Sequence, residues 1–130
     1  MRNAAAVERI FTVIAGVLGV LAVALGAFGS HGLAAHFAAR PDLQGPYETA
    51  NRYHMAHALA LLAVAWAATR WSSPLLPWAG WLFVAGVILF SGSLYVLSLT
   101  GLRWLGAVAP LGGMAFVAGW ALLALAAWRG

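Results

Sequence analysis

The chain has 130 residues, of which 64% are hydrophobic and 8% are charged; it has no cysteine and a formal net charge of +4. Long apolar segments with so few charges indicate one integral membrane domain over residues 1–130 and exclude a small soluble core. The lack of cysteine excludes disulfides, thiolate catalysis and Cys-based zinc or iron–sulfur sites. All seven basic residues are arginines placed singly at segment ends, a pattern that suits anchoring to lipid headgroups and argues against nucleic-acid binding.

The sequence predicts an all-α fold, a bundle of four antiparallel transmembrane helices. The first predicted span covers about residues 10–29, long enough to cross a hydrocarbon core of roughly 30 Å at about 1.5 Å per residue. Small residues near its end leave a secretory signal as an alternative, although its apolar run exceeds the usual roughly 7–15 residues of a signal. A mature chain that begins near Phe28 would establish that alternative.

The next segment, residues 30–46, mixes apolar residues with histidine and arginine, which predicts a short interfacial segment between the first two helices. Pro41, Gly45 and Pro46 close it, and Pro46 suits the first turn of the following helix. The second span is predicted at about residues 47–69, before Arg70 and Trp71.

The third and fourth spans are predicted at about residues 78–99 and 104–128. The connection between them is short, so they are expected to be antiparallel neighbours. Pro110 falls inside the fourth predicted span and is expected to interrupt its hydrogen-bond ladder, leaving a carbonyl that needs a partner in the bundle.

Four spans place both termini on one side of the membrane with the turn at 70–77. Four arginines lie near span ends on that side and three on the other, which favours termini inside the cell. Five of the seven tryptophans also fall toward the terminal side, as an interfacial aromatic belt would.

Polar residues from separate spans are predicted to meet near the opposite membrane face. Alternating helix directions bring the start of the second span, the end of the third and the connections at 30–46 and 100–103 to one level. Unpaired ionisable groups at such a depth are costly, so they are candidates for a site. The predicted pocket or polar layer contains His31, Glu48, Arg52, Tyr53, His54, His57, Ser91, Ser93 and Tyr95.

The histidine pair has three interpretations. His54 and His57 have the i, i+3 spacing that permits joint metal or haem ligation if a third ligand such as His31 approaches. Structural hydrogen bonds to Ser91, Ser93 or backbone carbonyls are the favoured interpretation, and proton transfer is the third. No catalytic residue, metal or cofactor is assigned.

Glu48 and Arg52 lie one helical turn apart, which predicts an ion pair that fixes the depth of the second span. Small residues predict close contacts between helices, as in the spacings Ala22-x-x-x-Gly26 and Ala115-x-x-x-Gly119. The residues assigned to helix packing or kinking are Gly26, Gly29, Gly92, Pro110, Gly112, Gly113 and Gly119.

Four motifs in order carry a resemblance to a known family. They begin at Gly26 (GAFGSHGL), Tyr53 (YHMAHAL), Phe90 (FSGSLY) and Pro110 (PLGG, followed by Gly119 and Trp120). Together they resemble the DUF423 family of small four-span membrane proteins, which includes YgdD-like and transmembrane protein 256-like members. The resemblance implies a multi-pass protein of the bacterial inner (plasma) membrane and supplies no catalytic role.

Three functions are compatible with these features. The first is a non-enzymatic protein, surrounded by membrane lipids, that acts through helix packing as a homo-oligomer or as an accessory subunit of a larger membrane complex. The alternative is a small-solute, lipid or quinone binding or transport protein that uses the polar pocket. The third, a redox or metal enzyme, predicts bound metal or a haem absorption band after purification.

Overall fold

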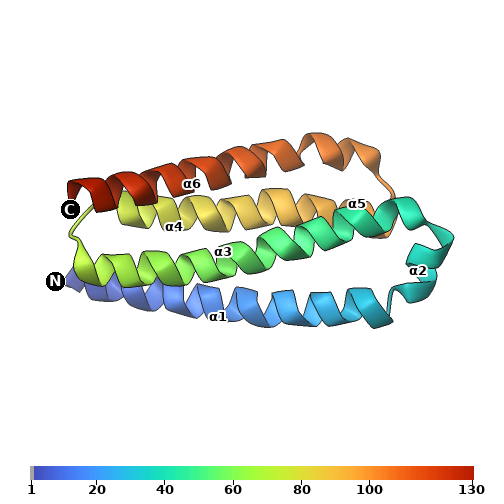
Figure 1. Cartoon of the computed structure of the whole chain (residues 1–130), viewed down its shortest axis with the longest axis horizontal. Coiled ribbons are helices and arrows are strands. Elements are labelled where there is room, and N and C mark those ends of the chain that lie inside the picture. Colours follow the sequence, from blue (N-terminus) through green and yellow to red (C-terminus); the bar gives the residue numbers. More distant parts are fainter. Residues whose placement is uncertain (1) are drawn as a thin grey trace.

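A computed structural model describes residues 2–130, and these residues form a bundle of helices with no strand among them (Figure 1). The predicted all-α class is therefore confirmed. The long helices are α1 (Arg2–His31), α3 (Gln44–Arg70), α4 (Leu75–Gly86), which continues through the π-turn η2 (Val87–Ser91) into α5 (Gly92–Thr100), and α6 (Ala109–Arg129). The connections contain α2 (Ala34–Ala39) and the 3-10 turns η1 (Pro41–Leu43) and η3 (Arg103–Ala107).

Three helical segments of the described chain are long and apolar enough to cross a membrane. They are Asn3–His31, Leu75–Thr100 and Arg103–Arg129, which correspond to the first, third and fourth predicted spans. The second predicted span, α3, is also long, but the polar residues of its first half lower its mean hydropathy. Length and composition thus confirm three spans of the four that were predicted.

The helices alternate in direction along one axis. Both termini and the α3–α4 turn lie at one end, and α2 and the α5–α6 connection lie at the other (Figure 1). Helix α1 packs along α3, α6 packs along α4, and α3 joins the two pairs through its contacts with α4 and α5. Helix α1 also buries Phe11, Ala15 and Ala22.

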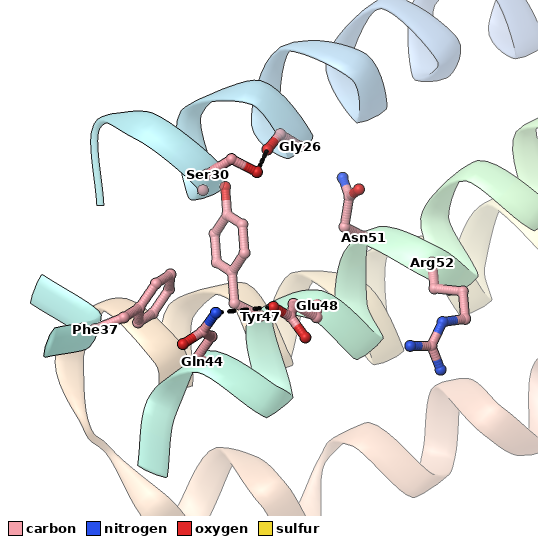
Figure 2. A pocket seen from close by; sticks show the side chains of 9 residues that line it. Gly26, Ser30, Phe37, Gln44, Tyr47, Glu48, Asn51 and Arg52 are labelled. Atoms are coloured by element: carbon pink, nitrogen blue, oxygen red, sulfur yellow. Dashed lines mark hydrogen bonds between the residues drawn. The ribbon is translucent and has the colours of Figure 1, made fainter. Parts of the chain in front are cut away.

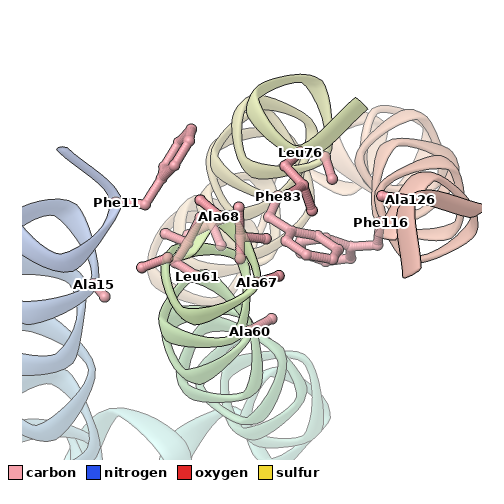
Figure 3. Close-up of a cluster of buried hydrophobic side chains, with 14 residues drawn as sticks. Phe11, Ala15, Ala60, Leu61, Ala67, Ala68, Leu76, Phe83, Phe116 and Ala126 are labelled. Atoms are coloured by element: carbon pink, nitrogen blue, oxygen red, sulfur yellow. The ribbon is translucent and has the colours of Figure 1, made fainter. Parts of the chain in front are cut away.

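The buried apolar cluster of the bundle contains the rings of Phe11, Phe83 and Phe116 (Figure 3), and these rings pack against glycines. A Cβ atom at Gly80 would lie 2.3 Å from Cζ of Phe11, and one at Gly119 would lie 2.7 Å from Cδ1 of Phe83. Both phenylalanines are 1% exposed or less. Because lipid tails are as apolar as these side chains, close packing is what favours helix contact over lipid contact.

The π-turn η2 interrupts the helix that runs from Leu75 to Thr100. Such single turns change the direction in which side chains point, and here the Ser91 hydroxyl donates a hydrogen bond of 2.8 Å to the Ala50 carbonyl on α3. On the opposite side, a Cβ atom at Gly112 would lie only 2.3 Å from the backbone nitrogen of Phe90. The two backbones therefore approach so closely that position 112 accommodates only glycine without movement.

The predicted interruption at Pro110 is wrong. Helix α6 begins at Ala109, because residues 103–107 form η3 instead of the start of the span. Pro110 therefore lies in the first turn, where a missing N–H breaks no intrahelical bond.

The two connections at the non-terminal end are joined by one acidic residue. The Asp42 carboxylate accepts hydrogen bonds of 3.0 and 3.1 Å from Arg40 and one of 3.2 Å from Arg103. The Arg40 hydrogen bond lowers the pKa of Asp42, and the carboxylate in turn raises the pKa of Arg40. Helix α2 packs against the start of α3 through Phe37 and Tyr47, so the predicted interfacial segment is an ordered part of the bundle.

Candidate functional site

A hydrogen-bonded chain links three helices at the predicted polar level. The Asn51 side-chain amide on α3 donates to the Ala22 carbonyl on α1 at 2.8 Å and to the Tyr95 hydroxyl on α5 at 3.1 Å. The same hydroxyl lies 3.0 Å from Nδ1 of His54. These hydrogen bonds connect side chains of α3 and α5 with a backbone carbonyl of α1, so they hold the three helices together.

The donors and acceptors in this chain allow us to assign the His54 tautomer. Asn51 donates to the Tyr95 oxygen, and a phenol has a single proton, so Tyr95 donates that proton to Nδ1 of His54. His54 then carries its own proton on Nε2. This nitrogen is buried and forms no hydrogen bond with the described residues, although the Leu18 backbone on α1 is near the ring.

His57 is held by a different set of partners. The Trp120 indole N–H donates to Nε2 of His57 at 3.0 Å, and because indole is only a donor, the histidine proton is assigned to Nδ1. Nδ1 donates to the Tyr53 carbonyl at 2.8 Å, and the ring stacks on Phe116 with centroids 3.6 Å apart. Both nitrogens of His57 are thus engaged: Nδ1 binds within α3, and Nε2 joins α3 to α6.

The serines that we expected to bind these histidines have other roles. Ser91 binds the Ala50 carbonyl, and Ser93 is buried without a hydrogen bond to the described side chains or backbone. His31 is exposed at the end of α1, where its Nδ1 lies 2.9 Å from the Ala27 carbonyl of its own helix. Within residues 2–130, no three His, Asp or Glu side chains lie close enough to hold a metal, so the condition for a shared metal site is not met.

The predicted Glu48–Arg52 ion pair is absent from the part of the chain that the structure describes. Glu48 accepts a hydrogen bond of 3.0 Å from the Gln44 amide instead, and both ion pairs among the described residues are made by Asp42. Glu48 and Arg52 are exposed, and their charged ends point apart (Figure 2). The reason is local, because Gln44 lies one turn before Glu48 and reaches its carboxylate first.

These charged residues line a groove between α1 and α3 with a volume of about 350 Å³ (Figure 2). Tyr47 and Asn51 bridge the two helices, since Tyr47 donates a hydrogen bond of 2.5 Å to the Leu25 carbonyl. Glycines on α1 permit this approach: a Cβ atom at Gly29 would lie 2.3 Å from the Tyr47 ring. The full lining is Gly26, Gly29, Ser30, Phe37, Gln44, Tyr47, Glu48, Asn51 and Arg52.

A second groove, of about 680 Å³, lies between α3, η2 and α6 and is almost wholly apolar. Tyr53 and His57 line it from α3. Phe90 and Met114 line it from the opposite helices. Pro110 and Gly113 are also in its wall, so two of the predicted packing residues border this space.

Sequence reasoning missed several residues that organise this end of the bundle. Asn51 was not singled out, although it lies one turn after Tyr47 on the side of α3 that faces α1. Trp120 was assigned no partner, and Gln44 was placed outside the span. The predicted interfacial segment includes His36 without a partner, whereas in the structure its Nε2 lies 2.7 Å from the Ser98 carbonyl. A helical wheel of α3 would have identified Asn51, but not the partners from other helices.

Comparisons with known proteins place the chain among membrane proteins without an assigned activity. A family model described as "Protein of unknown function (DUF423)" matches residues 25–113, more than half of the chain. The chain is 46% identical to the UPF0382 membrane protein YwdK of Bacillus subtilis, over 92% of this chain and 96% of that protein. It is 40% identical to the UPF0382 inner membrane protein YgdD of Escherichia coli, over 94% and 92% of the two chains. No solved structure shows a significant match.

Proposed function

The chain belongs to the DUF423 family of membrane proteins, and from this premise we propose that it is a non-enzymatic four-span protein that binds the polar headgroup of an amphiphile between α1 and α3. Helix α3 lies alongside the three apolar helices, and its 27 residues extend about 40 Å at about 1.5 Å per residue. Its inward polar side chains bind other helices, which supports its role as the fourth span.

The observation that carries the proposal is the pair of unneutralised charges in the groove. Glu48 and Arg52 are exposed, border the groove and form no ion pair with each other. Charged side chains within a bilayer are costly unless they find water, a partner or a headgroup. A ligand with a polar head and an apolar tail supplies both a partner for the charges and contact with the surrounding lipid.

The inner histidines support binding over chemistry or transport. His57 uses both ring nitrogens, and Tyr95 and Asn51 connect His54 to α5 and α1. These groups form hydrogen bonds between helices and do not line a transport pathway. The apolar groove is a poorer site for a quinone, because the Trp120 and His57 donors beside it are already engaged.

The proposal is tested by exchanging Arg52 for glutamine and analysing the purified protein by native mass spectrometry. We expect an amphiphile of defined mass to accompany the wild-type protein and to be lost from Arg52→Gln. Arg9→Gln is the matched control, since Arg9 is also exposed but lies near the opposite end of the bundle. Equal retention in both variants would overturn the proposal.

The second candidate is a non-enzymatic role in association, as a homo-oligomer or as an accessory subunit. Its support is the outer face of α1, where positions 16 and 19 are glycines with no atom within 4 Å of an added Cβ. Exposed Val13 and Val20 lie beside them. By contrast, Gly26 and Gly119 of the predicted small-residue pairs pack inside the bundle, against Asn51 and Phe83.

Association is tested by the oligomeric state in mild detergent and by the variant Gly16→Leu. A dimer or complex that dissociates in Gly16→Leu supports this candidate. A strictly monomeric wild-type protein with no retained protein partner refutes it.

A further inference from the structure

We propose that the groove binds a phospholipid whose headgroup carries a primary ammonium, of the phosphatidylethanolamine class, with its phosphate at Arg52 and its ammonium at Glu48. This inference rests on the proposed function and specifies the headgroup and its orientation. It follows from the order of the charges along α3, from the free donors and acceptors, and from the apolar surface below them.

The charges stand in a definite order of depth. Gln44, Glu48 and Arg52 occupy successive turns on one side of α3, which begins at Gln44 near the connection end. At about 1.5 Å per residue, Arg52 lies about 6 Å deeper along the helix than Glu48 and about 12 Å deeper than Gln44. The cation is therefore toward the bilayer interior and the anion toward the headgroup surface.

A zwitterionic glycerophospholipid has the complementary order. Its phosphate is attached to the glycerol, next to the acyl chains, and its amine extends outward from the phosphate. A phosphate at the level of Arg52 thus places the amine about one helical turn toward Glu48. The reverse order on α3, with the acid closer to the bilayer interior than the base, would place each charge beside a headgroup charge of the same sign.

The available hydrogen-bonding groups distinguish among headgroups. The Arg52 guanidinium forms no hydrogen bond with the described residues and presents the fork that binds phosphate oxygens in pairs. Glu48 uses Oε1 for Gln44, which leaves Oε2 to accept a proton of a primary ammonium. A trimethylammonium has no proton to donate, and a glycerol headgroup has no cation for Glu48.

Exposed apolar side chains follow the charged residues along α3. Leu59 and Leu62 lie deeper on the same side of α3 and are 59% and 45% exposed. Acyl chains attached below the phosphate would lie along these side chains. At the outer end, Phe37 and Gln44 border the groove and bound the headgroup site on that side (Figure 2).

The experiment measures lipid binding to the detergent-purified protein by native mass spectrometry. Phosphatidylethanolamine, phosphatidylcholine and phosphatidylglycerol with identical acyl chains are titrated in turn. We expect an apparent affinity for phosphatidylethanolamine about tenfold higher than for the other two, the factor that one additional charge-assisted hydrogen bond provides. Water-soluble O-phosphoethanolamine is added as a competitor, and we expect it to leave lipid binding unchanged at equal concentration.

Single variants test which residue binds the ammonium and which binds the phosphate. Glu48→Gln is expected to reduce the preference for phosphatidylethanolamine over phosphatidylcholine to within about twofold, because the ammonium loses its anionic partner. Arg52→Gln is expected to weaken all three phospholipids about tenfold. Glu8→Gln is the matched control, since Glu8 is exposed near the terminal end of α1. If Arg52→Gln does not fold, Arg52→Lys, which keeps the cation, is expected to retain the preference.

The outcomes separate this inference from the proposed function. Loss of lipid in Arg52→Gln without any headgroup preference in the wild-type protein leaves the binding function intact and overturns the assignment to phosphatidylethanolamine. Unchanged lipid binding in Arg52→Gln overturns both. Complete displacement of the lipid by O-phosphoethanolamine shows that the natural ligand is a soluble phosphate ester and refutes the lipid assignment.

Discussion

The close backbone contact between α6 and η2 predicts a large difference between two adjacent glycine variants. A Cβ atom at Gly112 would lie 2.3 Å from the nitrogen, 2.7 Å from the Cβ atom and 2.8 Å from the Cα atom of Phe90. At Gly113 the nearest atom of Phe90 would be Cδ2, at 3.8 Å, which is an ordinary contact. Both positions belong to α6 and both gain an alanine in the same helix.

The two variants allow the steric cost to be isolated. Replacing glycine by alanine within a helix stabilises it by up to about 1 kcal/mol, and this gain is similar at both positions. At Gly112 the new methyl group meets backbone atoms, so α6 must move away from η2 by more than about 1 Å to reach a contact of about 3.5 Å. Overpacking of this kind costs about 1–3 kcal/mol. Gly113→Ala should therefore equal or exceed the wild-type stability, and Gly112→Ala should fall below Gly113→Ala by about 1–3 kcal/mol.

The free energy of unfolding is measured in mixed micelles by titration with sodium dodecyl sulfate, using the fluorescence of the seven tryptophans. The comparison uses the difference between the two alanine variants, so errors common to both cancel. Variants that agree within about 0.5 kcal/mol would show that α6 and η2 do not approach as closely as described.

Three further predictions concern hydrogen bonds and charge. Tyr95→Phe removes the hydroxyl that bonds to Asn51 and His54 and should lower the free energy of unfolding by about 0.5–2 kcal/mol. Tyr53→Phe is the control: its side chain is exposed, and the change should be less than about 0.5 kcal/mol. Equal losses in the two variants would contradict the hydrogen-bond network. Trp120→Phe should shift the Nε2 resonance of His57 in nitrogen NMR spectra, because this nitrogen loses its donor, while the Tyr53 carbonyl keeps the proton on Nδ1; a wild-type ring protonated on Nε2 would refute the assignment. Asp42 has a pKa below its ordinary value of 3.8. The stabilisation that its ionised carboxylate contributes is therefore fully present above pH 3.8 and is lost as the pH falls through the lowered pKa. Unfolding of the wild-type protein and Asp42→Asn should accordingly differ at pH 6 and converge in acid; a difference that persists in acid would exclude this role for the carboxylate.

The polar layer shows where sequence reasoning succeeds and where it fails. Alternating spans place His54, Tyr95 and Ser91 at one level, because axial depth follows from residue counts, and in the structure Tyr95 binds His54 and Ser91 binds the Ala50 carbonyl. The partner of each residue was not predictable in the same way. Glu48 binds Gln44 instead of Arg52, and Pro110 begins a helix instead of interrupting one, because local turns shift the helix starts by several residues.

The sequence by itself determined that the protein is an all-helical membrane protein, three of its apolar spans, the order of its connections and its family. These features depend on the length of apolar segments and the order of motifs, which can be read from each segment separately. Only the tertiary structure decided which atoms meet. The rotation of each helix about its axis and its register against its neighbours select the Asn51–Tyr95–His54 chain and the His57–Trp120 pair. Those two quantities depend on how rings fit glycines across helix interfaces, an outcome of packing that no single segment contains.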